Sequence, residues 1–158
     1  MTDTAWLDER ESRAWRGFQA MADQLETALH RSLVRNTGLS LSDYAVLVYL
    51  SESPEDRLRA FELGAALRWE KSRLSHHLRR METRGLVERR TCANDGRGLW
   101  VALTPEGRKA IEEAAPLHVA DVRSLLIDQL TKEQQEALAV IAEKVLAAMP
   151  SDEDLCAT

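Results

Sequence analysis

The sequence predicts a mainly helical protein with a small β wing, that is, a winged helix-turn-helix flanked by N- and C-terminal dimerisation helices. Three observations favour this fold class. Residues 61–84 form two short helical segments in succession, residues 86–103 form two strand-like segments around an Asp-Gly pair, and both ends of the chain repeat apolar residues at steps of three and four. Such steps place apolar side chains on one helix face, and Asp-Gly between strands indicates a hairpin.

Two helices are expected before the central region. The first spans residues 5–34 and is capped at Gly38, because glycine tolerates the left-handed backbone at a helix C-terminus. The second starts at Ser42 and Asp43 and stops before Pro54, where the chain becomes extended over residues 57–59. The apolar stripe of the first helix consists of Trp15, Phe18, Met21 or Ala22, Leu25, Leu29 and Leu33.

The central and C-terminal elements follow from the same patterns. Thr104 and Pro105 start a helix as its N-cap and first residue, and Pro116 is expected to kink it. A last helix begins near Thr131, where Gln134 completes a capping box. The central segments are expected, in order, as helices over 61–67 and 70–84 and strands over 86–92 and 99–103, joined by 93–98. The apolar face of the last helix contains Leu138, Ile141, Val145 and Met149.

The wide apolar stripes of the terminal helices indicate burial against a second copy of the chain, with packing inside one subunit as the alternative. The expected organisation has four parts. They are an N-terminal dimerisation arm (1–38), the winged helix-turn-helix (39–104), C-terminal dimerisation helices (105–149) and a disordered tail (150–158).

Composition narrows the class of protein. A chain of 158 residues with 44% apolar content suits one domain with helical extensions. The longest apolar run, residues 44–50, is too short to span a bilayer, and the acidic N-terminus lacks a signal pattern, so a cytoplasmic protein without a membrane partner is expected. Cys92 and Cys156 lie in unlike contexts and no Cys/His metal spacing occurs, so neither a disulfide, a metal nor a cofactor is expected.

The net charge of −5 hides an uneven distribution. Residues 1–56 carry a net charge of −5, residues 57–100 carry +6, and residues 101–158 carry −6. A basic centre between acidic arms suits a phosphate-bearing partner, although a solvated surface would also account for the arginines. Because the basic segment coincides with the helices and the hairpin, double-stranded DNA is the expected partner.

Residues 70–84 separate into two faces when drawn as a helix with 100° per residue. Leu74, Leu78 and Met81 form the core stripe, and His77 lies close to it as a packing residue. Trp69, at the turn before the helix, is interpreted as a structural plug rather than a base-stacking group. The outward side presents Ser72, His76 and Arg79, flanked by Arg73, Ser75 and Arg80.

The side chains on the outward face are donors that suit base edges and phosphates. Either Arg73 or Arg79 is expected to make a bidentate contact to guanine, worth about 1–3 kcal/mol of discrimination. Arg97 at the hairpin tip is expected to enter the minor groove, and Asp95 either holds its guanidinium or only forms the turn. The predicted DNA-binding residues are Lys71, Ser72, Arg73, Ser75, His76, Arg79, Arg80, Asp95 and Arg97.

The chain resembles the MarR (multiple antibiotic resistance regulator) family. The resemblance rests on LRWEKSRLSHHLRRMETRGLV (67–87), on DGRG (95–98) and on LTPEG (103–107). It implies a homodimer that binds a pseudo-palindromic operator, most often as a repressor, and it implies release by a small-molecule effector. The resemblance places the effector between the dimer helices and the DNA-binding lobe, with Trp15, His30, Tyr44, Val48 and His118 as candidates.

The sequence also leaves alternatives to an effector-released DNA-binding repressor. Oxidation of Cys92, or zinc held by His30 and His118, would make a redox- or zinc-responsive regulator of the same fold. A winged-helix protein-interaction module that does not read DNA is a further alternative, and the exposed basic face argues against it. An enzyme is not expected, because glycine-rich phosphate loops, nucleophile elbows and metal-ligand motifs are missing from the sequence.

Overall fold

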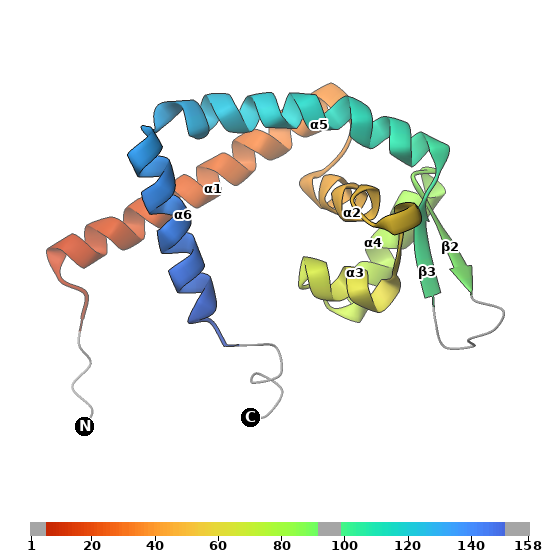
Figure 1. The fold of residues 1–158 in the computed structure, drawn as a ribbon, viewed down its shortest axis with the longest axis horizontal. Helices are drawn as coiled ribbons and strands as arrows, with labels where there is room; N and C mark the ends of the chain where they lie inside the picture. Colours follow the sequence, from red (N-terminus) through yellow and green to blue (C-terminus); the bar gives the residue numbers. More distant parts are fainter. Residues whose placement is uncertain (1–5, 92–98, 151–158) are drawn as a thin grey trace. The chain divides into compact units, whose positions relative to one another are not determined.

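The computed structural model (Figure 1) describes residues 6–91 and 99–150. Helices dominate the chain, and a small antiparallel sheet accompanies them, which confirms the predicted fold class. The elements, in chain order, are α1 (Glu9–Thr37), α2 (Leu41–Ser51), the 3-10 helix η1 (Pro54–Asp56), β1 (Arg57–Arg59), α3 (Ala60–Leu67), α4 (Lys71–Thr83), β2 (Val87–Thr91), β3 (Leu99–Leu103), α5 (Pro105–Leu125), the 3-10 helix η2 (Ile127–Gln129) and α6 (Lys132–Ala147).

The chain divides into two compact units, one up to Val119 and the other from Ala120 onwards. The first contains α1 to β3 and most of α5, and the second contains the end of α5, η2 and α6.

The first two helices begin at capping boxes. Asp8 accepts a hydrogen bond from the Glu11 backbone at 2.7 Å, and the Glu11 side chain accepts one from the Asp8 backbone, so α1 starts at Glu9 rather than near residue 5. At its other end α1 continues to Thr37, and Gly38 caps it with φ of 73°, as predicted. The cap of α2 is Ser40, so this helix begins at Leu41, just before the predicted start.

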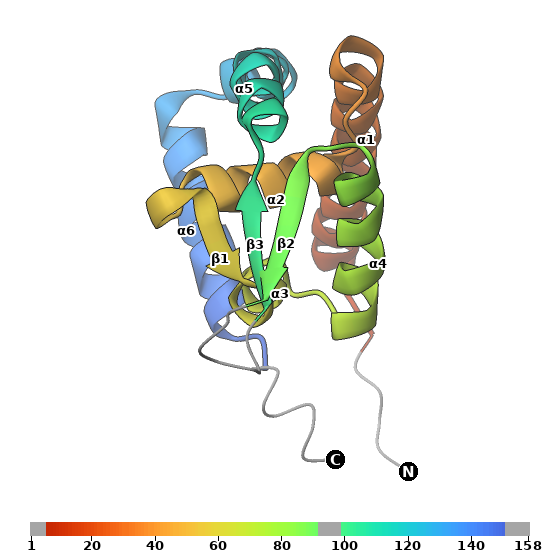
Figure 2. The ribbon, with the colours of Figure 1, turned by 90° about the vertical axis from the view of Figure 1, so that its right-hand side faces the viewer.

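The sheet has three antiparallel strands in the order β1-β3-β2 (Figure 2). The segment predicted to be extended is β1, and it pairs with β3 so that Leu58 lies opposite Val101. On the other side Arg89 of β2 also lies opposite Val101, which is fully buried. Alternation along a strand therefore places Arg59, Trp100 and Arg90 together on the outer face.

The core of the first unit lies between α2, α3, α4, α5 and the inner face of the sheet. The three apolar residues predicted for the buried stripe of α4 are at most 5% exposed. Buried residues from the other elements complete the core: Leu33, Leu39, Val46, Leu47, Leu50, Leu63, Leu86, Val87, Val101, Ile111 and Ala114.

The remaining bounds differ from the prediction by one or two residues. Helix α3 begins at Ala60, α4 spans Lys71–Thr83 with Glu70 as its N-cap, and β2 begins at Val87. Helix α5 continues through Pro116 to Leu125. Residues 1–5, 92–98 and 151–158 lie outside the described residues. The predictions for the hairpin connection and for the tail fall on these residues.

The second unit contains the predicted capping box. Thr131 accepts a hydrogen bond from the Gln134 backbone, and the Gln134 side chain accepts one from the Thr131 backbone. The predicted apolar face of α6 is largely exposed, with Ile141 at 60% and Val145 at 50%. Among the residues described, no helix is long and apolar enough to cross a membrane.

Candidate nucleic-acid interface

Helix α4 presents one polar face to solvent. Its buried side is formed by Leu74, Leu78 and Met81, in agreement with the predicted stripe. Seven of the nine predicted DNA-binding residues lie on α4 and all seven are exposed: Lys71, Ser72, Arg73, Ser75, His76, Arg79 and Arg80. The other two, Asp95 and Arg97, lie outside the described residues, so their pairing and their place at the wing tip stay predictions.

A tight turn between α3 and α4 sets the start of this face. Arg68 adopts a left-handed backbone with φ of 52°, and the Trp69 backbone donates a hydrogen bond to the Gly64 carbonyl at 2.9 Å. A β-carbon on Gly64 would lie 3.4 Å from Leu74 and 3.5 Å from the Trp69 carbonyl oxygen, which are ordinary van der Waals contacts, so the packing of the two helices leaves room for a small side chain there.

Asp43 holds α4 against the beginning of α2. Its side chain is only 6% exposed, and its Oδ2 accepts hydrogen bonds from Arg84 Nη1 at 2.8 Å and from the Ser40 backbone at 2.9 Å. The other oxygen, Oδ1, lies 3.0 Å from His77 Nε2. Burial by itself would raise the pKa of Asp43, but the contacts with His77, Ser40 and Arg84 outweigh it and lower that pKa well below its usual value.

His77 therefore has two roles in the structure. Its side chain is 12% exposed, which agrees with the packing role that the helical face predicted. Its contact with Asp43 was not predicted, because the two residues come from separate helices. The sequence held one signal for Asp43, the capping box Ser-x-x-Asp, but that box accounts only for the start of α2.

The wing is attached to α4 and α5 at its base. Arg89 of β2 donates to Glu82 of α4 at 2.6 Å and 3.0 Å, and these hydrogen bonds lower the pKa of Glu82. Thr104 donates to the Gly85 carbonyl and accepts from the Gly107 backbone, which is the predicted N-cap of α5. A β-carbon on Gly107 would lie 1.9 Å from the Leu86 carbonyl oxygen, so only glycine fits there without movement.

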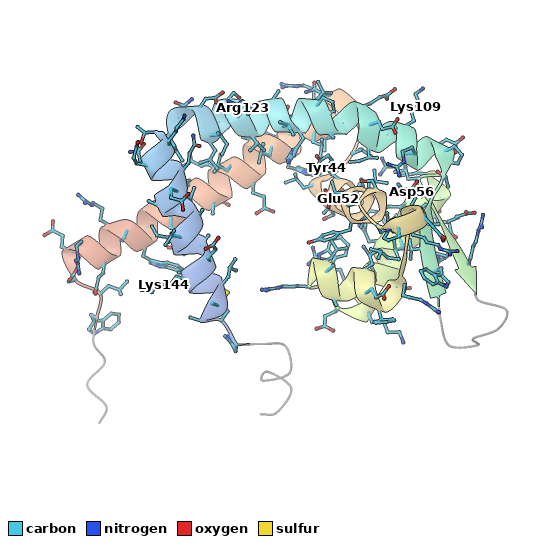
Figure 3. All side chains as sticks on the ribbon, viewed as in Figure 1. Tyr44, Glu52, Asp56, Lys109, Arg123 and Lys144 are labelled. Atoms are coloured by element: carbon cyan, nitrogen blue, oxygen red, sulfur yellow. The ribbon has the colours of Figure 1, made fainter. Side chains whose placement is uncertain are left out.

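Two further ionic or aromatic clusters lie beside the wing. The guanidinium carbons of Arg57 and Arg59 lie 4.8 Å and 4.4 Å from the ring centroid of Trp100. Asp56 pairs with Arg108, which joins η1 to α5 near the exposed Lys109 (Figure 3). Sequence reasoning missed both clusters, because it did not assign a partner to the extended segment.

The predicted effector residues do not form one cluster. The rings of Tyr44 and His118 lie 4.4 Å apart, centroid to centroid, and Val48 lies one helical turn after Tyr44. Trp15 stacks instead on Phe18, and His30 is exposed on the same helix. Trp15 and His30 are separated by about 22 Å of helix, so they do not share one small-molecule pocket within a protomer.

The environment of Tyr44 is partly buried. Burial and the negative charge of Glu52 raise the pKa of the Tyr44 hydroxyl above its ordinary value. Figure 3 marks Tyr44 on α2 and Glu52, which follows α2 as its C-cap. A separate pocket of about 540 Å³ lies between α3, α4 and the wing, where Phe61, Leu74 and Leu78 provide an apolar lining. Within residues 6–91 and 99–150, no three His, Cys, Asp or Glu side chains gather as a metal site.

These elements define a class of protein. A helix-turn-helix with a basic exposed second helix, followed by an antiparallel wing, is a winged-helix architecture that transcriptional regulators use. Residues 37–98 match the sequence profile of the MarR family. The chain belongs to the MarR family, whose members are transcriptional regulators and not enzymes.

Individual relatives support the same assignment. The transcriptional regulator HosA of Escherichia coli O157:H7 is 32% identical over 109 residues, which cover 68% of this chain and 78% of HosA. Sco3205, a MarR family transcriptional regulator from Streptomyces coelicolor solved in complex with DNA, matches with a TM-score of 0.90 and 38% identity over 97% of this chain and 96% of Sco3205. AbsC, a MarR family transcriptional regulator from the same organism, matches with a TM-score of 0.83 and 40% identity. The match covers 91% of this chain and 99% of AbsC.

Proposed function

We propose that this protein is a dimeric, sequence-specific DNA-binding regulator of transcription that acts in the cytoplasm. The observation that carries the proposal is the exposed polar face of α4, whose opposite face is buried in the core. In this arrangement α4 enters the major groove, where arginine, serine and histidine reach base edges and phosphates. The predicted Arg97 accompanies it in the neighbouring minor groove, and Asp95 either holds the Arg97 guanidinium or only forms the turn. The relative Sco3205, solved with DNA, supports this partner.

Dimerisation accounts for the apolar side chains that one chain leaves exposed. In α1, Trp15 and Phe18 are 51% and 55% exposed, and in α6 Ile141 and Leu146 are at least half exposed. We assign dimerisation to residues 1–38 and 105–149 and DNA binding to 39–104. A two-fold dimer presents two copies of α4, which suits a pseudo-palindromic operator.

A repressor released by a small effector is the regulatory mode that we propose. Tyr44 and His118 are the best supported of the effector candidates, because their rings are in contact beside the partly buried Val48. An effector shifts the protein away from DNA only if it binds the DNA-incompetent arrangement more tightly than the competent one.

The experiment that tests DNA recognition is fluorescence anisotropy of the full chain on the duplex upstream of its own gene, with a scrambled duplex as control. We expect tighter binding to the first duplex and a linear fall of log affinity with log salt. Equal, weak binding to both duplexes would oppose a specific site on that DNA, and sedimentation of the same sample tests the dimer separately.

A further inference from the structure

We infer that Trp69 is a positioning residue for Arg73, and that the stack of these two side chains commits Arg73 to reading a guanine. This inference deepens the proposed function and rests on it. Of the three arginines of α4, Arg73 and Arg79 are the predicted candidates for a guanine contact. The surroundings of Arg73 distinguish it from Arg79, because the Arg73 guanidinium lies over the Trp69 ring at 4.4 Å from the centroid.

Trp69 is held at two points, its backbone and its ring. Its backbone is fixed in the turn by the hydrogen bond to Gly64. Its ring meets the imidazole of His77 edge to face, with centroids 5.1 Å apart and an angle of 81° between the planes. The guanidinium of Arg73 therefore rests on a ring whose backbone is fixed in the turn and whose side chain packs against His77.

His77 also lies against another helix. Its Nε2 lies 3.0 Å from Asp43 Oδ1, and Asp43 is held in turn by Arg84 and by the N-cap of α2. A continuous series of contacts thus leads from α2, through Asp43, His77 and Trp69, to the exposed Arg73. The orientation of Arg73 is consequently tied to the fold rather than left to a free side chain.

The chemistry of the stack favours base reading. All five N–H donors of a guanidinium lie in its plane, so a face that rests on an indole leaves the donor edge free. That edge matches the O6 and N7 acceptors of guanine in the major groove. Arg73 is the third residue of α4, and the N-terminal residues of a recognition helix are those that contact bases. Stacking before binding also lowers the side-chain entropy lost on contact.

The stack is tested first without DNA. The full chain labelled with 5-fluorotryptophan contains four tryptophans, and Trp69→Phe assigns the Trp69 signal in the ¹⁹F NMR spectrum. We expect Arg73→Ala to shift that signal, whereas the matched variant Arg79→Ala leaves it in place. An unchanged Trp69 signal in Arg73→Ala would overturn the inference, whatever the protein does with DNA.

The consequence is tested by selection from randomised duplexes with the full-length wild type and variants. We expect Arg73→Ala to abolish the preference for one G·C pair, and Trp69→Leu to reduce the same preference about 2- to 5-fold. Trp69→Phe should fall between wild type and Trp69→Leu, and the double variant Trp69→Leu/Arg73→Ala should resemble Arg73→Ala. Arg79→Ala removes another residue of the DNA-binding face, so it should weaken binding to all duplexes while the preference for this G·C pair stays.

Two results would count against a positioning role. The first is that Trp69→Leu weakens binding to all duplexes equally. The second is that the double variant binds DNA clearly more weakly than Arg73→Ala. Either result would show that Trp69 has a purely structural role. Thermal unfolding of each variant separates that effect from misfolding, and Trp69→Phe provides a conservative variant if Trp69→Leu unfolds. A wild type without any sequence preference would refute the proposed function, and the NMR experiment would still decide whether the stack exists.

Discussion

Arg84 Nη1 donates a hydrogen bond to Asp43 Oδ2 at 2.8 Å, although the two residues are 41 positions apart in the chain. The second terminal nitrogen of Arg84 donates to the Gly38 carbonyl at 2.9 Å. One side chain after the end of α4 therefore contacts both the cap of α1 and the first turn of α2. The direction in which α4 projects from the domain depends on this polar junction as well as on the apolar core.

Loss of the Asp43 charge should destabilise the fold. We expect Asp43→Asn to lower the free energy of unfolding by about 2 kcal/mol, since it weakens charge-assisted hydrogen bonds to a buried group. Urea unfolding followed by circular dichroism measures the change. The matched control is Asp23→Asn on the exposed side of α1, which should change stability by less than about 0.5 kcal/mol. Equal effects of the two variants would show that the junction contributes little.

The same carboxylate should make stability depend on acid pH. The pKa of Asp43 is lower in the folded state than its ordinary value near 3.9, so its contribution is present above that value. It is lost as the pH falls through the folded pKa. We expect the urea midpoint of the wild type to drop below about pH 4 and the drop to be smaller in Asp43→Asn. Parallel curves for the two proteins between pH 5 and pH 2 would argue against this assignment.

Gly107 should not tolerate a side chain. A β-carbon there would lie 1.9 Å from the Leu86 backbone oxygen, so the start of α5 and the base of the wing would have to separate. We expect Gly107→Ala to lower the free energy of unfolding by about 1–3 kcal/mol in a denaturant titration. Gly17→Ala in α1 is the opposite case, because nothing lies within 4 Å of the added atom, and it should be neutral or stabilising. If Gly107→Ala is as stable as the wild type, the backbones at Gly107 and Leu86 lie farther apart than this distance indicates.

The predicted role of Arg97 is open to direct measurement. If Arg97 enters the minor groove, Arg97→Ala should weaken operator binding strongly and reduce the slope of log affinity against log salt by about 1. The dimer should stay intact, because the wing tip is separate in sequence from the terminal helices. Lys109→Ala, which removes an exposed charge from α5, is the control. Unchanged affinity of Arg97→Ala at physiological salt would remove the wing tip from the interface.

Local patterns in the sequence were enough for much of the fold. The spacing of Leu74, Leu78 and Met81 decided which side of α4 is buried, because a helix repeats every 3.6 residues whatever surrounds it. Gly38 and the Thr131 capping box were predictable for the same reason, since a cap is made by residues within one turn of each other. The polar face of α4 followed directly as the side opposite the buried stripe.

Contacts between distant segments were decided only by the tertiary structure. The spacing of residues along one helix says nothing about which residue of another helix lies beside it, so the pairing of Asp43 with His77 and Arg84 was not predictable. The pairing of β1 with β3 was missed for the same reason. Arg73 and Arg79 look alike on an isolated helix, and they differ only because the turn from α3 places Trp69 beneath Arg73. Periodicity determines what a helix buries, whereas packing between elements determines how its exposed side chains are held.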